Sequence, residues 1–133
     1  MKHPRNLGIA LSVCFSSLAV FQLALALGAP LGLFAWGGQG GAGVLPADLR
    51  TASAAATALL LIFAGVILVR VEVISLPAIQ RVVRVITWLI MAQLVLNTAA
   101  NLASPSGPER YLMSPITLLM AVMTFFVARQ RPQ

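Results

Sequence analysis

The chain has 133 residues, of which 59% are hydrophobic and 9% are charged, and its formal net charge is +6. A small soluble domain must cover a large surface with polar side chains and carries about 25% charged residues, so this composition excludes a soluble globular protein. The basic residues lie at the ends of apolar runs and form no patch or stripe, so we expect no nucleic-acid partner. The single cysteine, Cys14, excludes an internal disulfide.

Four apolar segments are separated by charges and turn residues. A helix needs about 20 apolar residues to cross the hydrocarbon core of a bilayer. The first charge-free run, residues 6–47, is too long for one crossing and breaks near Gly28 and Pro30. The sequence therefore predicts an all-α fold, a four-helix transmembrane bundle in which residues 1–133 form one domain. The expected helices cover about residues 7–27, 46–69, 80–102 and 115–129.

The longest connection is the glycine-rich segment 28–45, because its glycine density disfavours a regular spanning helix. Phe34 and Trp36 lie within this segment, and we expect their rings at the level of the lipid headgroups. Pro46 and Asp48 then favour a helix start, since proline suits the first helical turn and an acid there complements the helix dipole.

The orientation follows from the basic residues, because connections on the cytoplasmic side are enriched in Lys and Arg. With the N-terminus inside, two arginines, Arg50 and Arg110, lie outside. The remaining basic residues all lie inside, namely Lys2, Arg5, Arg70, Arg81, Arg84, Arg129 and Arg131. We therefore predict a multi-pass protein of the cell membrane with its N-terminus and C-terminus in the cytoplasm.

One alternative is that the first apolar segment is a cleaved signal peptide. Lys2 and Arg5 resemble a positively charged n-region, and residues 24–26 resemble a cleavage site. The apolar stretch from Leu7 is longer than the usual h-region of about 7–15 residues, so a retained helix is the favoured interpretation.

Amide side chains follow one face of the third predicted helix. Gln93, Asn97 and Asn101 recur every fourth residue, so they share that face. An amide in hydrocarbon costs free energy unless it is hydrogen-bonded, so the stripe should face other helices. It serves either as interhelical packing or as the wall of a ligand or water-filled cavity.

The first predicted helix carries small and polar residues on one face, which we expect to pack against that stripe. They are Gly8, Ser12, Ala19, Gln22 and Ala26. A candidate polar cluster then converges below the outer surface, made of Gln22, Ser53, Thr57, Gln93, Asn97 and Asn101. The inner half of the second helix is wholly apolar, which favours an outward-facing pocket over a pore through the membrane.

Two acid and base pairs, Asp48 with Arg50 and Glu109 with Arg110, lie in the outer connections. A guanidinium near lipid favours a carboxylate partner. We therefore expect a charged lid, in which Arg50 contacts Glu109 or Arg110 contacts Asp48. The alternative is ordinary helix-end electrostatics and contact with headgroups.

No catalytic, metal or cofactor motif is present in the sequence. The only histidine, His3, lies at the predicted inner end, which excludes a Ser-His-Asp set with the outer residues. No Cys/His cluster suits a metal or haem, so we expect no cofactor. Proton-coupled carriers place Asp, Glu or His in the membrane, and none occurs here at mid-depth.

Two short motif clusters lie at the predicted outer end. The first is Trp36-Gly37-Gly38-Gln39, Val44-Leu45-Pro46, Leu49-Arg50 and Ser53. The second is Asn101, Ser104, Ser106, Glu109-Arg110 and Pro115. With these motifs the chain resembles small four-helix integral membrane proteins common in actinobacteria, and the similarity covers most of its length. The resemblance implies a four-helix membrane fold with its working end outside, and it implies no particular activity.

These observations favour a non-enzymatic membrane protein, either a binding module or an accessory subunit. A small oligomeric transporter or channel ranks second, and a membrane enzyme that uses Asp48 and Glu109 ranks third. The expected partners are membrane lipid and either a larger membrane protein or further copies of this chain.

Overall fold

The computed structural model describes residues 3–41 and 43–131, which are helical with no strand. The four long helices are α1 (His3–Ala26), α2 (Ala47–Arg70), α3 (Gln80–Leu102) and α4 (Ser114–Ala128). Short helical turns lie between them: η1 (Gly32–Phe34), η2 (Trp36–Gly38), η3 (Pro77–Ile79) and the π-helical turn η4 (Glu109–Met113).

The four long helices match the four expected membrane spans in length and composition. With η3 and η4 included, the spans His3–Ala26, Ala47–Arg70, Pro77–Leu102 and Glu109–Ala128 are each long and apolar enough to cross a membrane. The predicted all-α, multi-pass architecture is therefore confirmed. The main differences are that α1 begins earlier than expected and that the segment 28–45 contains two helical turns.

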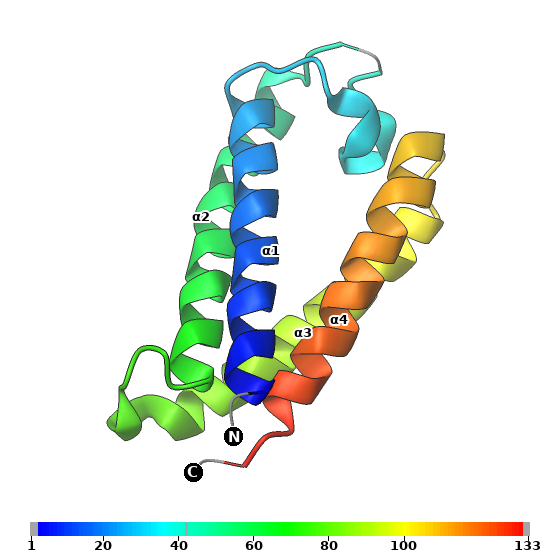
Figure 1. The fold of residues 1–133 in the computed structure, drawn as a ribbon. Helices are drawn as coiled ribbons and strands as arrows, with labels where there is room; N and C mark the ends of the chain where they lie inside the picture. The colour runs from blue at the N-terminus through cyan, green and yellow to red at the C-terminus, as the bar shows by residue number, and fades with distance from the viewer. Residues whose placement is uncertain (1–2, 42, 132–133) are drawn as a thin grey trace.

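The helices form two pairs, α1 with α2 and α3 with α4 (Figure 1). Contacts within a pair outnumber those between pairs. Figure 1 shows that the pairs approach each other near the chain termini, which share one end, and diverge toward the other end. The turns η1 and η2 lie at the divergent end, between α1 and the start of α4.

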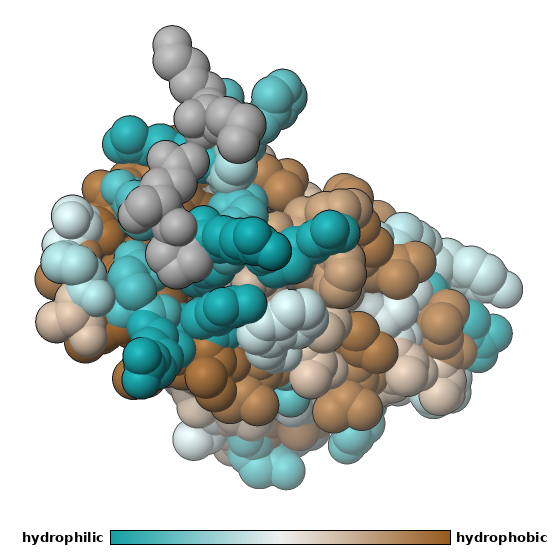
Figure 2. Space-filling model, turned by 90° about the horizontal axis from the view of Figure 1, so that it is seen from below, coloured by the Kyte–Doolittle hydropathy of each residue, from teal (hydrophilic) through white to brown (hydrophobic). Residues whose placement is uncertain are grey.

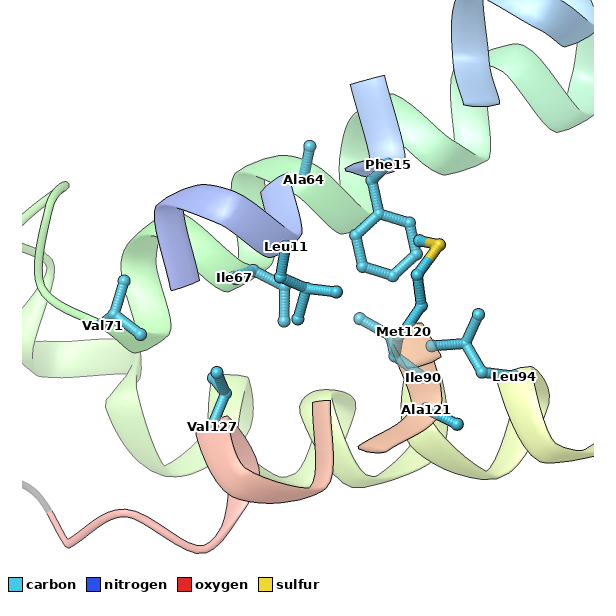
Figure 3. Packing of buried hydrophobic residues seen from close by; sticks show 10 residues of the cluster. All are labelled: Leu11, Phe15, Ala64, Ile67, Val71, Ile90, Leu94, Met120, Ala121 and Val127. Carbon is cyan, nitrogen blue, oxygen red and sulfur yellow. The ribbon is translucent and has the colours of Figure 1, made fainter. Parts of the chain in front are cut away.

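The main core closes the end that holds the termini (Figure 3). Leu11 and Phe15 of α1 meet Ile67 of α2 and Val127 of α4, and all four are fully buried. Because lipid tails are as apolar as these side chains, the gain here comes mainly from close packing. The cluster draws on all four helices and includes Leu11, Phe15, Ala64, Ile67, Val71, Ile90, Leu94, Met120, Ala121 and Val127.

The small residues of α1 pack against α2, which corrects the expectation that they meet α3. Ser12 Oγ donates a hydrogen bond to the carbonyl oxygen of Ala64, 3.0 Å away. A Cβ added to Gly8 would lie 2.5 Å from both methyl groups of Val71. Small residues at such positions let two backbones approach closely, which explains the tight α1–α2 pair.

Arg70 joins the end of α2 to the end of α4, at the same end of the bundle. It is the last residue of α2, and only 4% of its surface is exposed. Its Nη2 donates hydrogen bonds to the carbonyl oxygens of Ala128, at 3.3 Å, and of Gln130. Ala128 ends α4 and Gln130 lies just beyond it, so neither carbonyl has an intrahelical donor, and the arginine satisfies both. Hydrophilic residues gather around the termini on this face (Figure 2).

Candidate functional site

A cavity of about 600 Å³ lies between the two helix pairs, at the end away from the termini. Its wall draws on the second half of α1, the turns η1 and η2, the middle of α2, the second half of α3, and η4 with the start of α4. Its position follows from the packing, because the helix pairs diverge beyond the core.

Four of the six residues of the predicted polar cluster line this cavity, namely Gln22, Gln93, Asn97 and Asn101. Gln93 Nε2 donates to Asn97 Oδ1 over 3.2 Å, and Asn101 Nδ2 donates to Thr117 Oγ1 of α4 over 3.4 Å. Within residues 3–41 and 43–131, the buried Oε1 of Gln22 accepts no hydrogen bond. Of the three amides in the stripe, only Asn101 bonds to another helix in the part of the chain that the structure describes, whereas Gln93 and Asn97 are exposed at the cavity and bond to each other.

Ser53 and Thr57 lie behind the wall instead of on it. Thr57 Oγ1 donates a hydrogen bond of 2.9 Å to the backbone oxygen of Ser53, one turn earlier in α2. The fully buried Ser53 side chain accepts a hydrogen bond from Trp36 Nε1, 2.9 Å away. Ser53 therefore contributes to the site by holding Trp36, and Thr57 adds only a local helix contact.

Phe34 and Trp36 line the cavity, where the sequence led us to expect rings beside the lipid headgroups. Trp36 adopts φ 53°, a left-handed conformation that is unfavourable for a bulky residue. Such strained residues persist only where the surroundings fix them, and here the bond to Ser53 does so. No local sequence signal indicates this inward position, because it depends on a contact with α2.

The expected charged lid is not formed, because the guanidinium groups of Arg50 and Arg110 donate to backbone carbonyls instead of to carboxylates. Arg50 Nε donates to the carbonyl oxygen of Ala26, the last residue of α1, over 3.1 Å. Helix C-terminal carbonyls lack intrahelical donors and attract cations, which explains this choice. Asp48 is exposed at the start of α2 and makes no hydrogen bond through its side chain within the described residues.

Glu109 and Arg110 act separately as well. Arg110 donates to the carbonyl oxygen of Ser104 from Nε and Nη2, at 3.1 and 2.7 Å. The Glu109 carboxylate lies on the cavity wall with 7% of the residue exposed. Its Oε2 accepts a hydrogen bond of 2.6 Å from Ser104 Oγ. The prediction of an Arg50–Glu109 or Arg110–Asp48 ion pair is therefore wrong, and Glu109 belongs to the cavity.

Neutral contacts form the roof that the charged pairs were expected to supply. Ser106 Oγ donates to the carbonyl oxygen of Leu33, which joins the α3–η4 connection to η1. Gly38 approaches the same serine so closely that an added Cβ would lie 2.7 Å from Ser106 Cβ. The glycine also has φ +72°, which L side chains rarely adopt.

The described residues hold no group of three or more His, Cys, Asp or Glu side chains arranged for a metal ion. Comparison of the chain with protein-family models, curated proteins and solved structures found no match. The amide groups, the carboxylate and the aromatic rings that line the cavity suit binding through hydrogen bonds, charge and dispersion.

Proposed function

We propose that this chain is a non-enzymatic multi-pass membrane protein that binds a small amphipathic molecule in the cavity between its helix pairs. The observation that carries the proposal is the cavity itself. Its volume of about 600 Å³ falls in the range of small-molecule sites, about 300–1,000 Å³. Its wall combines apolar side chains with a few polar groups, the composition by which such sites fix both affinity and orientation.

The cavity is proposed to open toward the outside of the cell membrane, with both termini in the cytoplasm. The described basic residues Arg5, Arg81, Arg84, Arg129 and Arg131 belong to the elements that meet at the terminus end, which supports this orientation. Reporter fusions at residue 40 and after residue 133 should report outside and inside, respectively. A C-terminal reporter found outside would overturn the orientation and leave ligand binding untouched.

The closed end of the bundle favours a binding protein over a continuous channel. The core around Leu11, Phe15 and Ile67 fills the interior below the cavity, and Arg70 ties α2 to the end of α4. A transporting form would have to separate these contacts. An accessory subunit uses the same cavity within a larger complex. Isolation in mild detergent, with identification of bound protein, distinguishes such a subunit from a binding protein that acts alone.

Ligand binding is tested with a neutral aromatic probe, triphenylphosphine oxide, whose phosphoryl oxygen suits amide donors. The chain has two tryptophans, so a Trp88→Phe variant leaves Trp36 of the cavity wall as the only tryptophan reporter. In phosphatidylcholine nanodiscs, the probe should change Trp36 fluorescence saturably, after subtraction of the signal from empty nanodiscs.

A matched pair of substitutions on α3 locates that binding. Ala100 lines the cavity, whereas Ala99 is equally exposed and lies outside the lining. Ala100→Phe should weaken binding of the oxide by at least about tenfold, which corresponds to about 1.4 kcal/mol. Ala99→Phe should leave it unchanged. Equal effects of the two substitutions, or no saturable binding at all, would refute the proposed function.

A further inference from the structure

Among the described residues that line the cavity, Glu109 has the one ionisable side chain. Lysine, arginine and histidine are absent from that lining, so an ionised Glu109 gives the wall a net negative charge. The residue is 7% exposed, and its surroundings screen a charge less than water does. The cavity therefore favours an occupant of positive charge and disfavours an anion.

The side chain of Glu109 contacts a neutral partner within the described part of the protein. Its hydrogen-bond donor is the uncharged Oγ of Ser104, and the adjacent guanidinium of Arg110 is directed to the backbone oxygen of Ser104. Within residues 3–41 and 43–131, no basic side chain forms a salt bridge with Glu109. A buried carboxylate without an ion-pair partner is unfavourable, and a cation that enters the cavity stabilises it.

Aromatic rings make up a large part of the same wall. Phe21 of α1, Phe34 of η1, Trp36 of η2 and Phe63 of α2 all contribute to it. The face of an aromatic ring attracts cations, most strongly for tryptophan, and the attraction grows when the cation is desolvated. A cavity lined by rings from four different elements and by one carboxylate therefore suits a cation that carries its own apolar groups.

We propose that the cavity binds a lipophilic organic cation, a compound with an ammonium or phosphonium centre and apolar substituents. This inference rests on the proposed function, because it names the ligand class of the same site. Glu109 neutralises the positive centre, and the aromatic rings with Leu59 and Leu60 enclose the substituents. A bare inorganic cation would leave the aromatic and aliphatic side chains of the lining without a partner, whereas the apolar substituents of an organic cation pack against them.

The test compares three probes of similar aromatic bulk and different charge in phosphatidylcholine nanodiscs, with Trp36 as the reporter in the Trp88→Phe background. They are tetraphenylphosphonium, triphenylphosphine oxide and tetraphenylborate, which are cationic, neutral and anionic. The phosphonium should bind more tightly than the neutral oxide and at least about tenfold more tightly than the borate. Empty nanodiscs correct each titration for partition into lipid.

The role of Glu109 is isolated by Glu109→Gln, which keeps the shape of the side chain and an oxygen that accepts from Ser104. This variant should bind the phosphonium at least about tenfold more weakly and change the affinity for the neutral oxide by less than about twofold. The matched control is Asp48→Asn, which removes an exposed carboxylate outside the cavity. It should leave the affinities for all three probes unchanged.

The outcomes separate this inference from the proposed function. Equal affinities for the phosphonium and the borate, or an unchanged phosphonium affinity in Glu109→Gln, would overturn the organic-cation assignment. If the neutral oxide still binds and Ala100→Phe blocks it, the proposed function stands alone. If none of the three probes binds saturably, both fail. The comparison of probes needs no substitution at residue 109, so it decides the assignment even if Glu109→Gln fails to fold.

Discussion

The indole Nε1 of Trp36 donates a hydrogen bond to Ser53 Oγ, 2.9 Å away, and this contact links the glycine-rich segment to α2. It holds a bulky residue in a left-handed backbone conformation at the cavity wall. Ser53 is fully buried, so its hydroxyl has no water to replace the indole. The position of the most polarisable ring of the cavity therefore depends on a residue that does not touch the cavity.

Substitution of Ser53 by alanine should release Trp36. Loss of one partner of a buried hydrogen bond costs about 1–3 kcal/mol, so the variant should unfold at lower temperature. The fluorescence of Trp36, measured in the Trp88→Phe background, should shift to longer wavelength as the ring gains contact with water. The control is Ser17→Ala, which removes an exposed bond to the backbone of Val13. Identical emission spectra for the two variants would contradict the role of Ser53.

The roof of the cavity is tested by two neighbouring glycines with nearly the same backbone conformation. Gly37 and Gly38 have φ +69° and +72°, so alanine at either position is strained by about 1–2 kcal/mol. A Cβ at Gly37 meets nothing within 4 Å, whereas one at Gly38 would lie 2.7 Å from Ser106 Cβ. Gly38→Ala should therefore destabilise the protein more than Gly37→Ala and should weaken the binding of triphenylphosphine oxide. Thermal unfolding and the Trp36 titration measure the two effects.

The α1–α2 contact is tested through Gly8 and Val71. Gly8→Ala should destabilise the protein by about 1–3 kcal/mol, because the new methyl group would overlap the valine. Val71→Ala in the same chain should restore part of that loss. Gly65→Ala in α2 is the control, since a Cβ there meets nothing within 4 Å and alanine favours a helix. Unfolding temperatures in one detergent compare the variants, and additive effects of the two substitutions would contradict the contact.

The end that holds the termini is tested through Arg70. Arg70→Met keeps most of the apolar bulk and removes both hydrogen bonds to the carbonyls of Ala128 and Gln130. Bonds from a charged donor contribute about 1.5–3 kcal/mol, so stability should fall by about that amount. The C-terminal segment should also become more sensitive to carboxypeptidase. Arg81→Met, at an exposed position on α3, should change neither property, and equal behaviour of the two variants would argue against the Arg70 contact.

The sequence alone determined the number and the approximate bounds of the membrane helices. Hydrocarbon leaves no water for backbone groups, so an apolar run of sufficient length must be helical, and this signal is local. The spacing of Gln93, Asn97 and Asn101 also predicted that these three amides share one face of the helix. The helix over 80–102 was found with its predicted bounds for the same reason.

Only the tertiary structure decided how these helices pair and what each charged group contacts. Arg50 and Arg110 donate hydrogen bonds to backbone carbonyls and not to the predicted carboxylates, and Glu109 lines the cavity. The inward position of Trp36 depends on Ser53, and the α1–α2 pair depends on Gly8 meeting Val71. These contacts join residues that are far apart along the chain or sit in its connections. Their partners are selected by packing in three dimensions, which the spacing of residue types along one helix does not specify.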